Sequence, residues 1–158
     1  FKLQADVFND NDGAYVACKI RAASCHHLFQ VSDRGIKALS TSNTVATLLP
    51  GTGFFLGKTQ ANARKILDAG AKVALASDYN PGSCHCDNLL FIAALSAPTL
   101  KISLVELWSA ITLNAAHALG LQKQGALVIG LKPRFSLFKA SKIDEITYHW
   151  GHNLSFRD

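Results

Sequence analysis

The sequence contains no methionine, and this absence bears on how much of a protein it represents. The chain starts at Phe1 and therefore shows no translation start of its own. No basic stretch followed by an apolar core opens the chain, so a secretory signal is not expected. We predict that the 158 residues are a piece of a longer protein, or a processed one, with a cytoplasmic location.

Long hydrophobic runs, paired cysteines and clustered basic charge are also missing. The longest apolar stretch, residues 89–95, falls well short of the roughly 18 to 20 residues that span a membrane. Cys18, Cys25, Cys84 and Cys86 form no CxxC pair, which favours reduced thiols. The net charge is +5, but lysine and arginine do not gather with aromatic residues. Neither a membrane nor a nucleic acid is therefore expected as a partner.

The residues that are present suit one ordinary globular core, with 49% hydrophobic and 17% charged residues. In the first eighty residues, short apolar runs alternate with amphipathic stretches, which is typical of βα units on a parallel sheet. The expected strands start about 20 to 28 residues apart, which leaves room for a crossover helix each time. We place these strands at residues 1–5, 23–27, 44–49 and 72–77.

Helices are expected between and after these strands. Ser32 is a good N-cap, and Ser103 with Glu106 forms a capping box that predicts a helix start. Pro98 is expected to end the helix that precedes this box. The predicted helices span residues 13–21, 32–39, 61–68, 87–96, 103–113 and 114–119. Two short strands, 126–129 and 134–138, are expected in the tail.

Polar residues follow each predicted strand, at the edge where parallel α/β sheets bind ligands. They are Gln4, Asp6, His26, His27, residues 50–53, Asp78, Asn80 and Ser83. An Asp and a His at such strand ends suit a metal-dependent hydrolase, in which the metal activates water and a side chain moves the proton. Each residue also has a structural explanation: residues 78–82 can be a turn, and His27 can be a buried strand histidine.

Cys84-His85-Cys86 combines two residue types that bind zinc. Adjacent residues rarely converge on one ion, and a structural zinc site normally has a second pair at CxxC-like spacing. We therefore interpret the triplet as loop residues near the rim of a pocket.

The stretch Asp78-Tyr79-Asn80-Pro81-Gly82-Ser83 resembles a strand-end motif of imidazolonepropionases, which are members of the amidohydrolase superfamily. Further segments agree with this family in order and spacing, and the likeness spans nearly the whole chain. They are residues 24–28, 45–51, 112–120 and 148–153.

The resemblance implies an α/β fold: a (β/α)8 barrel of the TIM type with a small flanking β-sandwich. This chain would be the carboxy-terminal half, with the later βα units in residues 1–122. Residues 123–158 would form part of the β-sandwich and the closing segment. The implied reaction is the hydrolysis of 4-imidazolone-5-propanoate to N-formimidoyl-L-glutamate in histidine degradation, with a Zn or Fe ion that supplies hydroxide.

The resemblance also implies roles for single residues. Asp78 would bind the metal and handle the proton, and His27 would polarise the ring carbonyl. The substrate would be held by Asn80, Gly82 and Ser83.

Two positions of the first motif depart from the family pattern. Gln4 stands where the family has a metal-binding His, and its amide oxygen is a weak ligand for such an ion. Val7 replaces a polar substrate-binding residue. The family's His-x-His ligands belong to the first strand of the barrel and lie outside this chain.

These departures leave two alternatives open: a decayed relative that serves as a binding or interaction protein, and an amidohydrolase acting on another cyclic amide. The expected partners are a small-molecule substrate and the missing amino-terminal half of the barrel, and a homodimer is compatible with the sequence. Half a barrel exposes unpaired strand edges, so the isolated chain is expected to be inactive and prone to aggregation.

Overall fold

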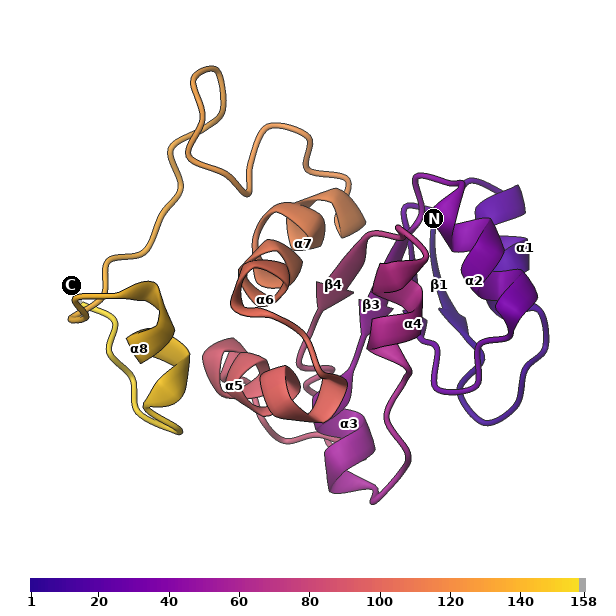
Figure 1. Cartoon of the computed structure of the whole chain (residues 1–158), viewed down its shortest axis with the longest axis horizontal. Coiled ribbons are helices and arrows are strands. Elements are labelled where there is room, and N and C mark those ends of the chain that lie inside the picture. Colours follow the sequence, from indigo (N-terminus) through magenta and orange to yellow (C-terminus); the bar gives the residue numbers. More distant parts are fainter. Residues whose placement is uncertain (157–158) are drawn as a thin grey trace.

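A four-stranded parallel sheet forms the centre of the computed structural model, which describes residues 1–156 (Figure 1). Its strands are β1 (Lys2–Ala5), β2 (Ser24–His27), β3 (Val45–Leu48) and β4 (Val73–Leu75). They lie in the order β1-β2-β3-β4, and each pairs in parallel with the next along the chain. All four strands lie within the ranges that the sequence predicts.

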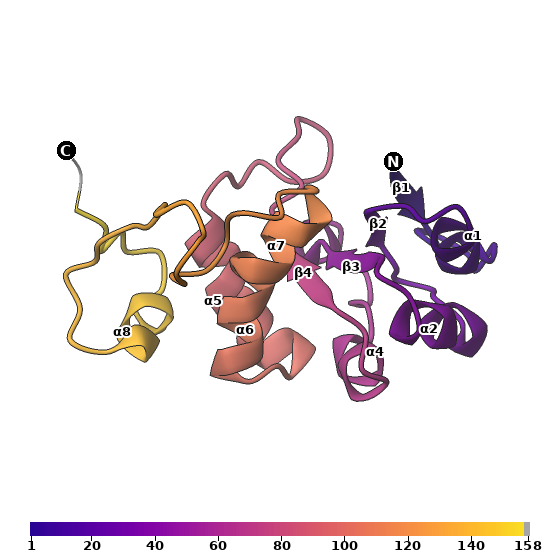
Figure 2. The same cartoon turned by 90° about the horizontal axis from the view of Figure 1, so that it is seen from above.

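The crossovers between the strands are helical, as expected. They contain α1 (Gly13–Lys19), α2 (Asp33–Ser40), α3 (Pro50–Phe55) and α4 (Ala63–Asp68). Figure 2 shows α2 and α4 along one side of the sheet. Helix α3 was not expected, because its first residues read as a polar loop. It starts with a proline at its first position, where a missing N–H has no helical partner to lose.

The two faces of the sheet differ in chemistry because side chains alternate along each strand. One face carries Cys25, Ala46 and Val73, which belong to the main hydrophobic cluster together with buried residues of α1, α2 and α4. On the other face, Gln4 is in register with His26, and His26 is in register with Thr47. This row of polar side chains leads towards the carboxyl ends of the strands.

Three helices follow β4: α5 (Leu89–Leu100), α6 (Leu104–Ile111) and α7 (Leu113–Ala118). The capping box that starts α6 is confirmed. The expectation that Pro98 ends α5 is wrong, since the helix continues to Leu100. Leu95 and Leu100 are each only 4% exposed, and burying them outweighs the hydrogen bond that proline cannot donate. Within residues 1–156, no helix is long and apolar enough to cross a membrane.

The tail does not form the predicted strands, and its assignment to a small β-sandwich is not supported. Residues 126–129 and 134–138 are irregular, apart from an isolated bridge between Phe138 and Ser155. The tail instead contains the short helix α8 (Ile143–Tyr148), which lies at the end of the molecule opposite β1 (Figures 1 and 2). An isolated pair of strands is stable only when its apolar face packs against another part of the protein. Ile129 is completely exposed, so this packing is missing in the tail.

Candidate functional site

A cavity of about 580 Å³ lies at the carboxyl ends of the strands. It brings together side chains from four consecutive βα units, as the strand-end argument predicts. Among the residues that line it are Gln4 from β1, His27 from β2, Thr52 from α3, and Asp78, Asn80 and Ser83 from the loop after β4. Of the six predicted site residues, only Gly82 is not part of this lining.

The backbone is strained where three of the strands end. Asp6 after β1, His27 and Leu28 at the end of β2, and Asp78 after β4 all have positive φ, at 51°, 73°, 59° and 55°. For residues with a Cβ, this left-handed conformation costs roughly 1 to 2 kcal/mol each. Such strain persists only where the surrounding structure enforces it, and it gathers at functional sites.

Asp6 shows how the fold enforces one of these conformations. Its buried carboxylate accepts hydrogen bonds from the backbone N–H groups of Asn11, Gly13 and Ala14, at 2.9 to 3.2 Å. Two of these donors belong to the first turn of α1. Asp6 therefore ties the end of β1 to the start of the next helix, and its role is structural.

Asp78 is half-buried and receives a hydrogen bond from another strand end. The hydroxyl of Thr52, on α3, donates to Oδ2 of Asp78 at 2.6 Å. Thr52 is only 4% exposed. The contact joins the end of β3 to the end of β4 and fixes one oxygen of the carboxylate.

Asn80 uses its side chain to shape the loop after β4. Its amide nitrogen donates to the backbone oxygen of Asp78 at 2.6 Å and to Oγ of Ser83 at 3.0 Å. Its amide oxygen accepts from the backbone N–H groups of Gly82 and Ser83, at 2.8 and 2.9 Å. The Asn80 amide is thus occupied within its own loop. Substrate binding by Asn80, Gly82 and Ser83 stays a prediction.

His27 is buried in the wall of the cavity, with 7% of its surface exposed. Its Nδ1 has no hydrogen-bond partner among residues 1–156. Burial lowers the pKa of this ring, and the nearby carboxylate of Asp78 partly opposes the shift. A neutral imidazole with a free ring nitrogen can donate to or accept from a bound molecule.

The neighbouring His26 is in a different environment, on the polar face of the sheet. Its Nε2 shares a hydrogen bond of 2.9 Å with Oγ of Ser24. The pKa of His26 is lowered by burial and then by the positive fields of His27 and Lys2, against the effect of Asp78. His26 does not line the cavity, and the catalytic role of His27 stays a prediction.

The donors in this chain do not complete a metal site by themselves. Asp78 and Gln4 line the same cavity, but no three His, Cys, Asp or Glu side chains among residues 1–156 gather to hold an ion. Zinc normally takes three or four protein ligands. Any ion at Asp78 would therefore need ligands from outside the described residues.

The Cys84-His85-Cys86 triplet belongs to no group of three metal-binding side chains among residues 1–156. Cys84 is buried, whereas the exposed His85 bonds through Nε2 to the backbone oxygen of Pro81 at 3.0 Å. These side chains do not converge, which agrees with their interpretation as loop residues.

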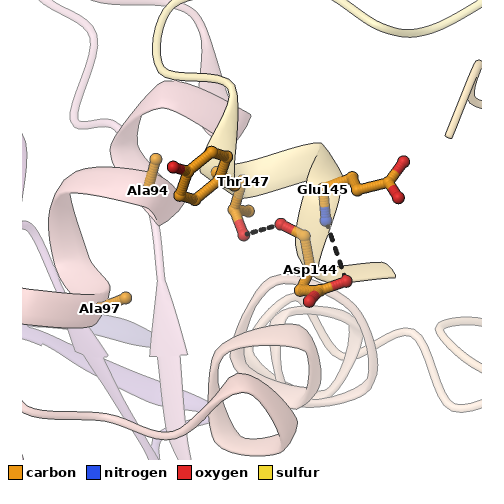
Figure 3. Close-up of a pocket in the computed structure, with 6 residues that line it drawn as sticks. Ala94, Ala97, Asp144, Glu145 and Thr147 are labelled. Atoms are coloured by element: carbon orange, nitrogen blue, oxygen red, sulfur yellow. Dashed lines mark hydrogen bonds between the residues drawn. The ribbon is translucent and has the colours of Figure 1, made fainter. Parts of the chain in front are cut away.

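A second hollow, of about 490 Å³, lies between α5 and α8 (Figure 3). It is lined by Ala94 and Ala97 of α5 and by Asp144, Glu145, Thr147 and Tyr148 of α8. The hydroxyl of Thr147 donates to the backbone oxygen of Asp144, within α8 itself. No His, Cys or Lys lines this hollow.

Sequence reasoning gave no role to four polar residues that line the strand-end cavity: Gln30, Thr52, Lys58 and Thr59. Thr52 was in the predicted strand-end segment but received no role, because its contact with Asp78 spans 26 residues of sequence. Lys58 also lines the cavity. It follows α3 and not a strand, so the strand-end rule does not find it.

Comparisons with known proteins show the family of the chain. The model of the amidohydrolase family matches residues 12–153. The imidazolonepropionase of Bacillus velezensis is 42% identical over 154 residues, which cover 96% of this chain and 37% of that protein. The imidazolonepropionase of Bacillus thuringiensis is 42% identical over 152 residues, 95% of this chain and 36% of that protein. The chain thus spans little more than a third of the length of these relatives.

Solved structures agree on the fold. An adenosine deaminase from Xanthomonas campestris with bound zinc matches with a TM-score of 0.70 at 18% identity, over 83% of this chain and 31% of that one. An N-isopropylammelide isopropylaminohydrolase from Burkholderia multivorans matches with a TM-score of 0.68 at 16% identity, over 93% of this chain and 42% of that one. These likenesses confirm the predicted α/β class with βα units of a TIM-type barrel.

Proposed function

Since the chain belongs to the amidohydrolase family, we propose that this protein hydrolyses the cyclic amide 4-imidazolone-5-propanoate to N-formimidoyl-L-glutamate. The observation that carries the proposal is the meeting of His27 and Asp78 at one cavity, in a chain 42% identical to imidazolonepropionases. The reaction belongs to histidine degradation. A cavity of about 580 Å³ suits a small-molecule substrate.

The proposed cofactor is one divalent metal ion, zinc or iron. Bound with Asp78 and further ligands from outside the described residues, such an ion would activate the attacking water and polarise the carbonyl. Zinc is favoured by the bound zinc of the structurally similar adenosine deaminase. Gln4 would contribute at most an amide oxygen, which is a weak ligand.

Two side chains of this chain then have different roles: Asp78 transfers the proton, and His27 stabilises the negative charge that develops on the carbonyl oxygen. Asp78 takes a proton from the attacking water and returns it to the ring nitrogen as the C–N bond breaks and the new C–O bond remains. His27, kept neutral by burial, donates an N–H to the oxygen of the ring carbonyl as negative charge develops there. The loop built by Asn80 places Ser83 at the cavity wall, where its hydroxyl holds the substrate.

A ring-opening assay on the protein expressed from its whole coding region tests this proposal. His27→Gln and Asp78→Asn should each lower kcat by about 100-fold or more, because each removes a group that acts on the reacting atoms. Thr147→Val in the second hollow is the matched control and should leave kcat unchanged. The proposal would be ruled out if the complete protein, as purified, contained no metal ion and had no ring-opening activity.

A second candidate is a non-catalytic relative that keeps the fold for binding. It is favoured by Gln4 and Val7, which line the cavity at places where the family has a His and a polar residue. The double variant Gln4→His, Val7→Glu distinguishes the two candidates. Ring-opening activity that appears only in the double variant identifies the natural protein as the binding form, whereas activity in the natural protein excludes it.

We further infer a cytoplasmic location and a division of the chain at residue 122. Cys18, Cys25, Cys84 and Cys86 are all free thiols, which suits a reducing compartment. The last βα helix before the division is α7, and the irregular tail follows it. The chain covers 37% of the Bacillus velezensis relative, and we propose that a further, amino-terminal segment completes the barrel.

A further inference from the structure

We propose that Thr52 is a positioning residue that holds the carboxylate of Asp78 in one orientation. The Thr52 hydroxyl donates to Oδ2 of Asp78 at 2.6 Å, a short distance typical of a hydrogen bond to an ionised carboxylate. Within residues 1–156, no other hydrogen bond reaches the carboxylate of Asp78. Oδ2 is therefore held, and Oδ1 is left for a ligand or a proton.

The position of Thr52 is itself fixed by close packing on both sides. A Cβ at Gly51 would lie 2.7 Å from Cδ1 of Ile92 and 2.8 Å from Sγ of Cys84, so only glycine fits between α5 and the Asp78 loop. A Cβ at Gly53 would lie 2.8 Å from Nε2 of Gln60. The first turn of α3, residues 50–53, is thus held by close packing, and all four residues of this turn are buried.

Gln60 adds a hydrogen bond to the close packing of this turn. Its Nε2 donates to the backbone oxygen of Pro50 at 3.0 Å, which ties the segment before α4 to the first residue of α3. Packing and hydrogen bonding together leave the Thr52 hydroxyl little freedom. A donor on such a rigid support can select one rotamer of its partner.

The backbone and the side chain of Asp78 are restrained separately. Asn80 binds the backbone oxygen of Asp78 at 2.6 Å and so supports its left-handed conformation, with φ at 55°. This contact leaves the side-chain torsions free. The rotation of the carboxylate is therefore restrained by Thr52, from a different strand end.

This restraint matters because proton transfer and ligand binding depend on the direction of a carboxylate oxygen. A displacement of about 1 Å at a reacting group can lower a rate by roughly 100-fold. Thr52→Val keeps the shape and burial of the side chain but removes the donor, and Thr52→Ser keeps the donor. In the proposed reaction, we expect kcat to fall by about 10- to 100-fold in the valine variant, with a smaller change in KM.

The test compares these two variants with Thr47→Val in the protein expressed from its whole coding region. Thr47 is a matched control, because it is a buried threonine at the end of β3 whose Oγ1 has no partner among residues 1–156. Kinetics are measured for all three variants, and thermal unfolding verifies that each one folds. Crystal structures of the natural protein and of the Thr52 variants record the rotamer of Asp78.

The expected result is a loss of kcat in Thr52→Val, recovery in Thr52→Ser and no loss in Thr47→Val, with Asp78 in more than one rotamer only in Thr52→Val. An unchanged single rotamer of Asp78 in Thr52→Val would overturn the proposal. The kinetic measurement rests on the proposed function, whereas the crystallographic one does not. An inactive natural protein would therefore count against the function and leave the role of Thr52 to be decided by the rotamers.

Discussion

His26 and His27 are adjacent in sequence but belong to opposite faces of the sheet, and both resist protonation in the folded state. Burial is the main cause of the lowered pKa of each ring. The unfolded chain takes up protons near the ordinary value of 6.5, whereas the folded rings bind them only at lower pH. The unfolded state then holds more protons, so the free energy of unfolding decreases as the pH falls below about 6.5.

This linkage predicts a specific pH dependence. Urea unfolding at several pH values between 7.5 and 5 should show stability lost on acidification, and the double variant His26→Gln, His27→Gln should show a smaller loss. His149→Gln, at an exposed position, is the control and should keep the natural dependence. Equal acid sensitivity in the double variant and the natural protein would refute the assignment.

The glycines near the site predict opposite outcomes for the same substitution. Gly51→Ala places a Cβ against Ile92 and Cys84 and should lower the free energy of unfolding by about 1 to 3 kcal/mol. Gly82→Ala meets only Oδ1 of Asn80, at 3.4 Å, and should change stability by less than about 0.5 kcal/mol. Urea unfolding of the two variants measures the difference, and similar values for both would contradict the packing around α3.

Single residues of the site differ in how far sequence alone locates them. His27 and Asp78 follow from the strand-end rule and the family motif, because both depend on local sequence. The occupied amide of Asn80 and the contact of Thr52 with Asp78 do not, since hydrogen-bond partners are set by the packed fold. Lys58 lies outside the pattern because it follows α3 and not a strand.

At the scale of whole elements, short-range patterns predicted the strands and most helices, and burial decided the exceptions. The four strands and α2 carry clear apolar runs or caps, and all were found as expected. Helix α5 continues past Pro98 because Leu95 and Leu100 on either side of the proline are buried. The predicted tail strands do not form, because apolar side chains there, such as Ile129, are exposed to solvent. Neither burial pattern can be read from a short window of sequence.

The proline in α5 offers a direct test of this balance. Pro98→Ala restores an N–H that can bond to the backbone oxygen of Ala94, at an exposed position where alanine meets no obstacle. We expect the free energy of unfolding to rise by about 1 to 3 kcal/mol, with a higher Tm. Pro81→Ala, in a loop, should lower it by less than about 1 kcal/mol. A lower Tm for Pro98→Ala would show that the proline is required for the packing of α5.

At the scale of the whole molecule, the sheet has two outer strands and the tail presents apolar side chains to solvent. β1 pairs only with β2, and Phe1 beside it is 95% exposed. In the tail, Leu127 is 73% exposed and Ile129 is completely exposed. Unpaired strand edges and apolar surfaces favour association with another chain.

The isolated 158 residues should therefore self-associate in solution, with a homodimer as the smallest product. Light scattering coupled to size-exclusion chromatography should show species larger than 17.0 kDa whose share rises with concentration. The variant Leu127→Lys, Ile129→Lys should show smaller species, because it places charge on the apolar tail. A monodisperse monomer of the natural sequence at every concentration would contradict this prediction.

The left-handed residues at the strand ends have a consequence for anyone who engineers this protein. Half-buried Asp78 occupies a conformation that glycine adopts without steric strain, so replacing it with glycine should make the chain more resistant to heat. A selection for heat tolerance alone would then enrich variants that have lost a side chain on which the proposed reaction depends. Thermostabilisation of this protein is best directed at positions such as Pro98, with the strand ends held constant.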